Sequence, residues 1–247
     1  MARMPQEVSG PDRNLIVRSL PEESASGFRE LLTPVTLRFG DVLYDALDEQ
    51  RYVFFPTEGV VSMLYLMENG SSAEIALVGR DGMVGLASAL GAGHSTNRAM
   101  VQVAGFAYRA PAKAVHRLMA SEPTRNILLR YSQVVMTQMS QTAVCNRHHT
   151  VVQQLCRWLL QSLDLVDGSE IQMTQQLMAE MLGVRREGVS LVASGLRADG
   201  LIDYTRGTVR VLDRGAMEAR VCECYAVVVR ETRRLLPPSK RRARAEA

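Results

Sequence analysis

Three consecutive residues, Arg185, Arg186 and Glu187, carry side chains that can bind and read double-stranded DNA. An Arg guanidinium forms paired hydrogen bonds with a phosphate or with the edge of guanine, and a Glu carboxylate accepts from the amino group of cytosine. The alternative is a solvated basic helix face that has no ligand. The elements around these residues decide between the two interpretations.

The segment before Arg185 has the signals of one short helix followed by a sharp turn. Thr174 is a hydroxyl N-cap, and Ala179 is small where a second helix would have to come close. Gly183 stands where such a turn needs a positive φ. The inward positions of this first helix are apolar: Leu177, Met181 and Leu182.

A second helix and a β-hairpin follow the turn. The second helix has Val189, Val192 and Leu196 at inward spacing. Gly200 ends this helix, and two short β-rich runs, Leu201 to Tyr204 and Thr208 to Val211, are joined by a turn that contains Gly207. Helix, tight turn, helix and β-wing describe a winged helix-turn-helix. Because spacing, turn glycine, wing and charge agree, we favour DNA binding over a plain helical hairpin.

The composition is that of a globular protein large enough for two domains. The chain has 247 residues, of which 47% are hydrophobic and 22% charged, and its net charge is +3. Since the whole molecule is not a polycation, any nucleic-acid surface must be a local concentration of charge. We expect a cytoplasmic protein, because no signal peptide or membrane-spanning run is visible and the four cysteines do not resemble a disulfide framework.

The first half of the chain changes from helical to strand-like periodicity. Asn14 to Leu32 reads as one or two short helices, and Val35 to Arg109 then runs in short β-rich pieces separated by turn signals. The clearest turn signal is Asn69-Gly70, between two apolar runs. Strands this short and evenly spaced predict an antiparallel, jelly-roll-like β-roll, so the expected fold class is α+β.

Helices are expected after the roll. A short helix covers Pro111 to Met119, and a long helix starts at Pro123 and breaks near Arg147-His148-His149. A separate helix follows from Val151 to Leu165. Asp213 caps a last helix, Arg214 to Leu236, which the prolines at positions 237 and 238 stop.

The long helix has an imperfect heptad seam and two interpretations. It is either a hydrophobic spine within one chain or a helix that pairs two chains. We favour the dimer helix, because a protein that reads DNA half-sites benefits from two-fold symmetry. The seam positions are Leu128, Tyr131, Val135, Gln138, Thr142 and Cys145.

A different chemistry is open to the cysteines and histidines. Cys145, His148 and His149 have the i, i+3, i+4 spacing that gathers metal ligands on a helix, and Cys156 is a further candidate. A metal- or thiol-dependent sensor or enzyme is therefore the alternative function. A buried cysteine beside two histidines at a helix break is the simpler interpretation, so we expect no metal, no cofactor and no catalytic residue.

The remaining two cysteines, Cys222 and Cys224, form a CxC pair on the expected last helix. Side chains at i and i+2 of a helix diverge. We therefore expect this pair to pack in a core and not to act together in redox chemistry.

A β-roll, a long helix and a C-terminal winged helix-turn-helix together resemble the Crp/Fnr family of bacterial transcription regulators. The resemblance covers roughly Leu15 to Asp213 and is strongest in TQQLMAEMLGVRREGV and FPTEGVVSMLY. It implies that the roll binds a small effector or none, that the long helices pair two subunits, and that the second helix of the motif enters the major groove.

The resemblance also implies DNA contacts by position. Arg186 and Glu187 match the family's Arg-Glu pair that reads base edges, whereas Leu191 stands where the best-known members have a second base-reading Arg. Leu can touch a thymine methyl but cannot bind guanine, so the best-known operator of the family is not expected. The expected DNA contacts are Thr174, Gln175, Gln176, Arg185, Arg186, Glu187, Ser190 and Arg206.

The roll departs from the cyclic-nucleotide pattern of the family. Leu86 replaces the acidic residue that accepts from the ribose, and Asn97 replaces the phosphate-binding Arg. Arg98 comes one place late, which on a strand points a side chain to the other face. Binding of cyclic AMP in the usual manner is not expected; a different effector and a purely structural roll both remain open. The candidate pocket residues are Gly85, Leu86, Ala87, Asn97, Arg98 and Ser140.

The sequence thus predicts four parts. Residues 14–120 form the cyclic-nucleotide-binding-like roll, 121–147 the long dimerisation helix, 148–236 the winged helix-turn-helix with an extra C-terminal helix, and 237–247 a basic, disordered tail. The expected protein is a homodimeric transcription regulator on an inverted-repeat operator. Its expected partners are double-stranded DNA, a second copy, the transcription machinery and a small-molecule effector, and not a membrane. A sensor that acts mainly through a protein partner is the third interpretation.

Overall fold

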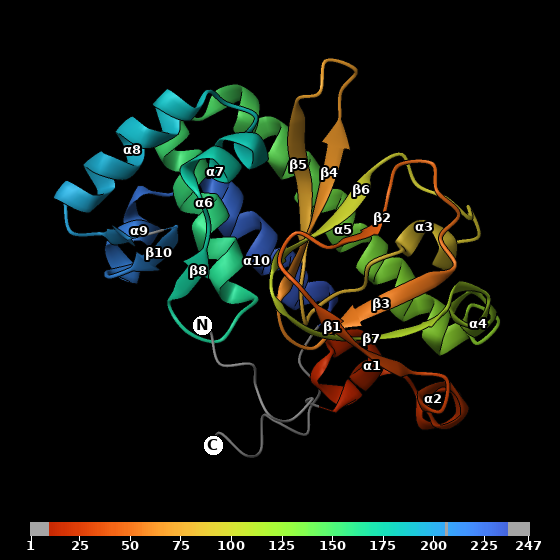
Figure 1. The fold of residues 1–247 in the computed structure, drawn as a ribbon. Coiled ribbons are helices and arrows are strands. Elements are labelled where there is room, and N and C mark those ends of the chain that lie inside the picture. The colour runs from red at the N-terminus through yellow and green to blue at the C-terminus, as the bar shows by residue number, and fades with distance from the viewer. Residues whose placement is uncertain (1–9, 206, 237–247) are drawn as a thin grey trace, which may run out of the picture. The chain divides into compact units, whose positions relative to one another are not determined.

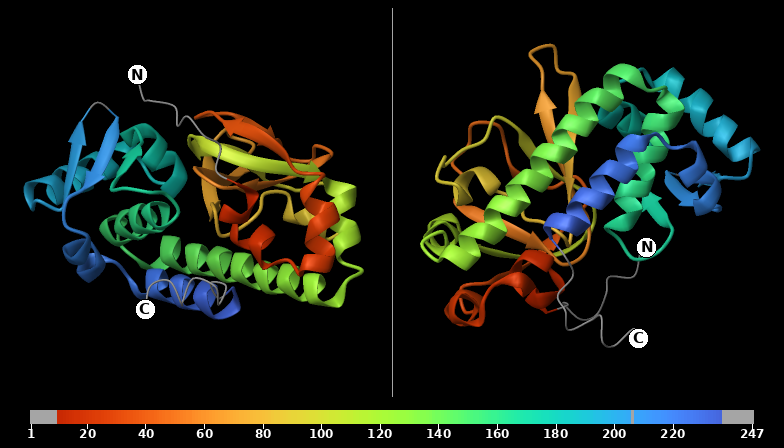
Figure 2. Two further views of the ribbon diagram at one scale, coloured as in Figure 1. Left: turned by 90° about the horizontal axis from the view of Figure 1, so that it is seen from below. Right: turned by 180° about the vertical axis from the view of Figure 1, so that it is seen from behind.

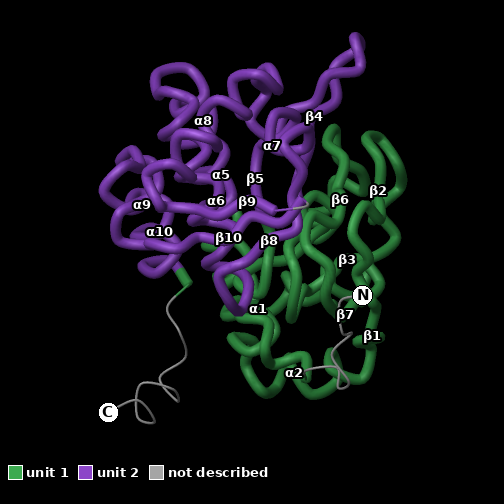
Figure 3. The backbone as a smooth tube through the Cα atoms, turned by 60° about the vertical axis from the view of Figure 1, so that its left-hand side comes forward, with its two compact units in different colours: residues 1–61, 78–132, 236–247 green, residues 62–77, 133–235 purple. Residues whose placement is uncertain are grey.

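A computed structural model describes residues 10–205 and 207–236 of the chain (Figure 1). The chain forms two compact units (Figure 3). Unit 1 comprises Met1–Val61, Val78–Ser132 and Leu236–Ala247, and unit 2 comprises Ser62–Leu77 and Gln133–Leu235. Among the helices of the described residues, none has the combination of length and apolar character that a membrane span needs.

A single 3₁₀ turn, η1 (Pro11–Arg13), begins the described part of unit 1. Two short helices follow it, as the sequence predicts: α1 (Leu15–Ser19) and α2 (Glu22–Arg29). Asn14 is buried, and its side-chain oxygen caps α1 by accepting from two backbone N–H groups of the first turn. The amide nitrogen of Asn14 donates to the carbonyl oxygens of Pro56 and Gly82, both at 2.8 Å. One buried amide therefore ties the first helix to two other segments of unit 1.

Antiparallel strands form the body of unit 1. Its elements are β1 (Thr33–Leu37), β2 (Val42–Tyr44), β3 (Tyr52–Pro56), α3 (Leu86–Ala89), β6 (Arg98–Val103), β7 (Gly105–Pro111) and α4 (Ala112–Leu118). Three strands form a sheet in the order β1-β7-β3, and β2 pairs with β6; every one of these pairings is antiparallel. The rings of Phe28 and Phe55 meet edge to face, with centroids 5.8 Å apart, between α2 and this sheet. The antiparallel roll predicted from the strand spacing is confirmed.

A hairpin of β4 (Val60–Leu66) and β5 (Ser72–Val78) lies mostly in unit 2. Its turn contains Gly70, which has a φ of 81°. The side chain of Asn69 accepts from the N–H of Ser71 at 3.0 Å, which closes the turn. The Asn-Gly pair therefore predicted this hairpin correctly.

The long helix α5 (Glu122–His148) has 27 residues and ends at the predicted break. The predicted seam is wrong as a surface for a second chain, because Leu128, Tyr131, Thr142 and Cys145 are buried within this one. The physical reason is that α5 uses its most apolar stripe to cover its own chain, which is the spine interpretation. Other large apolar side chains of α5 are exposed: Leu129, Met136 and Val144.

The rest of unit 2 contains the predicted helices and wing. These elements are α6 (Val151–Asp164), β8 (Glu170–Gln172), α7 (Gln175–Leu182), α8 (Arg186–Ala198), β9 (Ile202–Thr205) and β10 (Thr208–Val211). A capping box between Thr150 and Gln153 starts α6. The wing sheet has the order β8-β10-β9, so it has one strand more than the sequence predicts.

The expected last helix is two helices, α9 (Arg214–Arg220) and α10 (Glu223–Leu235). As predicted, the Asp213 side chain caps the first of them, by accepting from a backbone N–H. Val221 has φ −74° and ψ 154°, an extended conformation that ends α9. This break lets Met217 on α9 and Cys222 after it both be buried, and α10 then lies beside the second half of α5 (Figure 2).

Candidate functional site

The turn between α7 and α8 has the geometry that the sequence predicts. Thr174 caps α7 by accepting from the N–H of Leu177 at 3.2 Å. Gly183 has a φ of 65°, and the N–H of Val184 donates to the carbonyl of Ala179 at 3.0 Å. Ala179 is buried. The second helix of the motif therefore starts at a fixed angle from the first.

Helix α8 has one buried face and one exposed face. Its buried residues are Val189, Ala193 and Leu196, with Val192 half-buried. The opposite face presents Arg186, Glu187, Ser190, Leu191 and Ser194, all exposed except the half-buried Ser190. Leu191 is 77% exposed, the highest value among the large apolar side chains of the described residues. Leu offers an apolar surface of the kind that can touch a thymine methyl. Ser194 is an exposed residue of the same face that the sequence interpretation did not name.

The two arginines at the start of α8 differ from the arginine at its end in having no carboxylate partner among the described residues. Within the described part of the chain, Arg185 and Arg186 are exposed and have no ion-pair partner. By contrast, Arg197 at the far end of α8 pairs with Asp203 at 3.3 Å. Arg185 is the N-cap residue and makes no side-chain capping bond. Two guanidinium groups therefore stand free at the positive end of the α8 dipole, where both favour an anion.

The wing contacts the first helix of the motif. The N–H of Met173 donates to the carbonyl of Gly207 at 2.6 Å, and Gly207 has a φ of 79°. A Cβ at Gly207 would lie 3.8 Å from the Thr174 side chain. The tip of the wing and the start of α7 therefore share one edge of unit 2. The predicted contact Arg206 lies outside the described residues.

The two glutamines after Thr174 differ in their surroundings. Gln175 is half-buried. Gln176 is exposed, and its amide donates to the Glu180 carboxylate at 2.8 Å. Together with Thr174 they bring polar groups to the first turn of α7, where phosphate contacts are expected.

The roll residues singled out in the sequence lie at the start of α3 and at the start of β6. Gly85 has a φ of 100° and precedes α3, and an added Cβ there would meet the backbone of β3 at 3.2 Å. Leu86 and Ala87 are half-buried in the first turn of α3. Ser140, by contrast, is exposed on α5 in unit 2.

The side chains of Asn97 and Arg98 are both engaged inside unit 1. The buried Asn97 accepts from the Tyr44 hydroxyl at 3.3 Å, and burial raises the pKa of Tyr44. Arg98 donates to both oxygens of Asp45, at 3.0 and 2.6 Å, and these bonds hold the pKa of Asp45 below its ordinary value. Arg98 is therefore held in an ion pair, and Asn97 carries no charge.

The cysteines and histidines gather differently from the sequence interpretation. Cys145 and His149 do lie together, but His148 is exposed. The sulfur of Cys156 instead contacts the thioether sulfur of Met217, 3.8 Å away. Their neighbours are Cys222 and Cys224. The expectation that the side chains of the CxC pair diverge is wrong, because the helix expected to hold both residues breaks at Val221 and leaves Cys222 outside α10.

Comparison with known proteins matches two family models to the chain. The cyclic nucleotide-binding domain matches residues 34–122, and the Crp-like helix-turn-helix domain matches residues 153–220. Together they cover more than half of the chain. A search of curated proteins found no significant match.

Proteins from several bacteria have solved structures of similar fold. A putative transcriptional regulator of the crp/fnr family from Eubacterium rectale has a TM-score of 0.67 at 14% identity, over 85% of this chain and 98% of that one. FixK2 from Bradyrhizobium japonicum has a TM-score of 0.66 at 15% identity, over 77% and 98%. The c-di-GMP responsive global regulator CLP from Xanthomonas campestris has 0.60 at 14%, over 78% and 100%.

At these identities the structural likeness is one of fold, and the two domain matches carry the family assignment. A roll of the cyclic nucleotide-binding type precedes a long helix, and a helix-turn-helix of the Crp type follows it. The chain belongs to the Crp/Fnr family of transcription regulators.

Proposed function

We propose that this protein is a homodimeric, sequence-specific regulator of transcription that reads an inverted repeat in double-stranded DNA. The observation that carries the proposal is the outer face of α8. Arg186 and Glu187 are exposed there beside Arg185, which has no ion-pair partner in the part of the chain that the structure describes. Val189 and Leu196 hold the opposite face in the core. A Glu carboxylate beside a free guanidinium suits adjacent cytosine and guanine edges in the major groove.

Phosphate contacts would set the register of α8 on the duplex. The start of α7 lies next to Gly207 of the wing, since the N–H of Met173 donates to the Gly207 carbonyl. The proposed phosphate contacts are Thr174, Gln175, Gln176 and Arg206. These groups carry no base information, so they would position the reading face without choosing the sequence.

An exposed stripe on α5 supports the dimer. Exposed residues recur there in alternating steps of four and three, which is the spacing of a coiled-coil seam. They are Leu129, Gln133, Met136, Ser140 and Ala143. Two copies paired along this stripe would carry two α8 helices, and a dimer of this kind reads half-sites about 34 Å apart.

The proposed effector is not cyclic AMP bound in the usual manner. Asn97 and Arg98 are held by Tyr44 and Asp45, and Leu86 offers no acceptor for a ribose hydroxyl. CLP, a protein of similar fold, is described as a c-di-GMP responsive regulator, and c-di-GMP is larger than cyclic AMP. The same proposal places the protein in the cytoplasm and in contact with the transcription machinery. It assigns three parts to the chain, with the limits 14–120, 121–147 and 148–236.

Selection of bound fragments from random DNA, with and without cell metabolites, tests this function. We expect enrichment of an inverted repeat whose half-sites are centred one helical turn apart, about 10 base pairs. The double variant Arg186→Ala/Glu187→Ala is the control and should enrich no motif. The proposed function would be wrong if the selected DNA showed no enriched sequence, or if the protein bound no DNA even at low salt. Such a result would favour a sensor that acts through a protein partner.

A further inference from the structure

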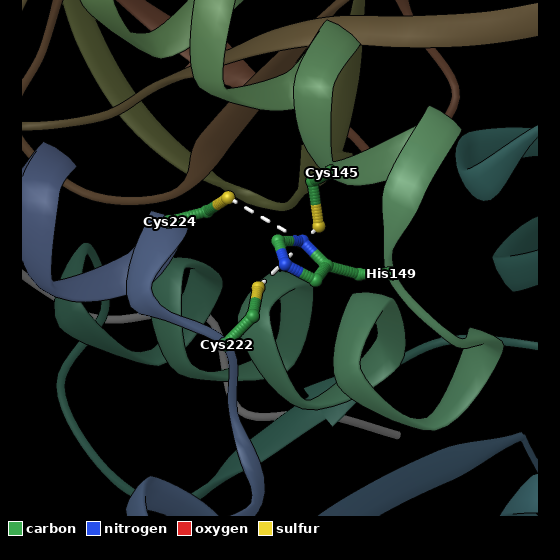
Figure 4. Close-up of side chains that lie close together, drawn as sticks. All are labelled: Cys145, His149, Cys222 and Cys224. Carbon is green, nitrogen blue, oxygen red and sulfur yellow. Dashed lines mark hydrogen bonds between the residues drawn. The ribbon is translucent and has the colours of Figure 1, made fainter.

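Four side chains with metal-binding atoms converge in unit 2, apart from the DNA-reading face. Cys145 lies in the last turns of α5, and His149 directly follows that helix. Cys222 lies between α9 and α10, and Cys224 in the first turn of α10. Their four ligand atoms all lie within 4.8 Å of one another (Figure 4).

Two of the separations within the cluster match those of a tetrahedral site. The sulfur atoms of Cys145 and Cys222 are 3.5 Å apart, and the sulfur of Cys224 is 3.6 Å from Nδ1 of His149. Bonds of about 2.3 Å from zinc to sulfur and about 2.0 Å to nitrogen set the ligand atoms of a tetrahedron roughly 3.5–3.8 Å apart. All four cysteines of the chain are free thiols. A small inward movement would therefore bring every atom of the cluster to a bond length from one centre.

The orientation of His149 supports a ligand role. Its Nδ1 faces the sulfur of Cys224, and its Nε2 lies 3.4 Å from a carboxylate oxygen of Glu223. A metal-bound histidine usually donates its other ring N–H to a carboxylate or carbonyl, which fixes the tautomer and the ring plane. The Gln154 amide also donates to the backbone oxygen of His149 at 2.9 Å, which holds the turn after α5 in place.

Burial and charge favour the metal-bound form of the cluster. Cys145, Cys222 and Cys224 are buried, and His149 is half-buried. Three thiolates and a neutral imidazole around a divalent ion leave one net negative charge. Arg157, which is 4% exposed, supplies a buried positive charge beside Cys145.

We propose that Cys145, His149, Cys222 and Cys224 bind one Zn²⁺ ion per chain in a closed tetrahedral site. On binding, three thiols release their protons to solvent and His149 coordinates through its unprotonated Nδ1. All four positions are filled by protein, so the site is structural and has no place for a substrate. The proposal does not depend on the DNA-binding function.

The position of the site gives it a consequence for the DNA-binding part of the chain. Cys145 and Cys222 are 77 residues apart in sequence and enclose α6, the helix-turn-helix and the wing. A metal that binds only the folded chain stabilises it, and the stabilisation grows with the logarithm of the free metal concentration once this exceeds the dissociation constant. Zinc at this point would join the end of α5 to the start of α10 and so hold the helix-turn-helix segment at both of its ends.

Elemental analysis of the full-length protein, purified under reducing conditions and then loaded with Zn²⁺ and desalted, tests the site. We expect close to one zinc per chain in the natural protein and less than a tenth of that in Cys222→Ser/Cys224→Ser. Cys156→Ser makes the same chemical change at a buried cysteine outside the cluster, and it should keep the full zinc content. Equal zinc in the double variant and the natural protein would overturn the proposal.

Cobalt substitution of the natural protein keeps the test independent of how the variants fold. One equivalent of Co²⁺ should give the intense visible d–d bands of a tetrahedral ion and thiolate charge-transfer absorption in the near ultraviolet, and Zn²⁺ should abolish both. Weak octahedral bands would overturn the assignment. So would iron with labile sulfide, or a metal-free Cys145–Cys222 disulfide found by mass spectrometry of the purified protein.

Discussion

Trp158 on α6 donates an indole hydrogen bond of 2.9 Å to the carboxyl group of Glu74 on β5, deep in unit 2. The other oxygen of Glu74 accepts from Ser62 at 2.6 Å. Burial raises the pKa of Glu74 to about 7, against the opposing effects of Ser62, Arg157 and Trp158. The hairpin and the first helix after α5 are therefore joined by a group that titrates near neutral pH.

Glu74 should make the stability of the protein fall as pH rises towards neutrality. The folded chain holds the proton more tightly than the unfolded chain, so this contribution is complete below about pH 4.5 and is lost as pH rises through about 7. The change should be on the order of 3 kcal/mol or less, since one pKa unit corresponds to about 1.4 kcal/mol. Urea unfolding at several pH values measures it. Glu74→Gln should remove most of the change in unfolding free energy with pH in this range. If the slope of that free energy against pH is unchanged in the variant, another group titrates there.

Arg186→Ala should weaken specific DNA binding by about 1–3 kcal/mol and blur one base position of the selected site. Arg186 is exposed and has no ion-pair partner among the described residues, so its removal should leave the fold unchanged. Arg197→Ala is the matched control on the same helix, because that guanidinium faces Asp203 at the far end. Electrophoretic titrations with the selected site and with single-base variants measure both. Equal losses for the two variants would contradict the assigned reading role.

Arg185→Ala should weaken binding to every DNA sequence to a similar degree. A phosphate contact carries no base information, and its loss should lower the slope of log K against log salt by about 1. Titrations at four salt concentrations on specific and random duplexes measure the slope. A change confined to the specific duplex would instead place Arg185 on a base edge.

Met136→Glu should convert the proposed dimer into a monomer without unfolding it. Met136 is 54% exposed on α5, so a charge there meets water in the single chain but a buried surface in the pair. Sedimentation equilibrium and circular dichroism measure the two properties. Leu212→Glu places the same charge at another apolar side chain, 55% exposed and away from α5, and should leave the oligomeric state unchanged.

Cyclic AMP should give no saturable heat in a calorimetric titration and should not alter DNA affinity. The Arg98 guanidinium is bound by both oxygens of Asp45, and Asn97 cannot supply a positive charge. Saturable binding that is lost in Arg98→Ala would show that the ion pair opens to receive a phosphate.

Much of the fold could be predicted from the sequence because its signals are local. Thr174, Gly183 and Gly200 act within one helical turn of their own positions, through a cap or a positive φ. The Asn69-Gly70 turn and the alternation of short strands likewise depend on near neighbours. These features were enough to predict the α+β class, the roll, the long helix and the winged helix-turn-helix, and to place Arg186 and Glu187 on an outer face.

What only the tertiary structure decided involves residues far apart in sequence. Heptad spacing cannot say which stripe of α5 its own chain covers, so the buried Leu128 and the exposed Met136 were told apart only by packing. The pairing of Arg98 with Asp45 and the approach of Cys222 and Cys224 to Cys145 are of the same kind. One extended residue, Val221, redirects the chain before α10, and no local propensity requires it to do so. Local hydrogen bonding and periodicity set the elements, whereas burial of distant surfaces against one another set which side chains meet.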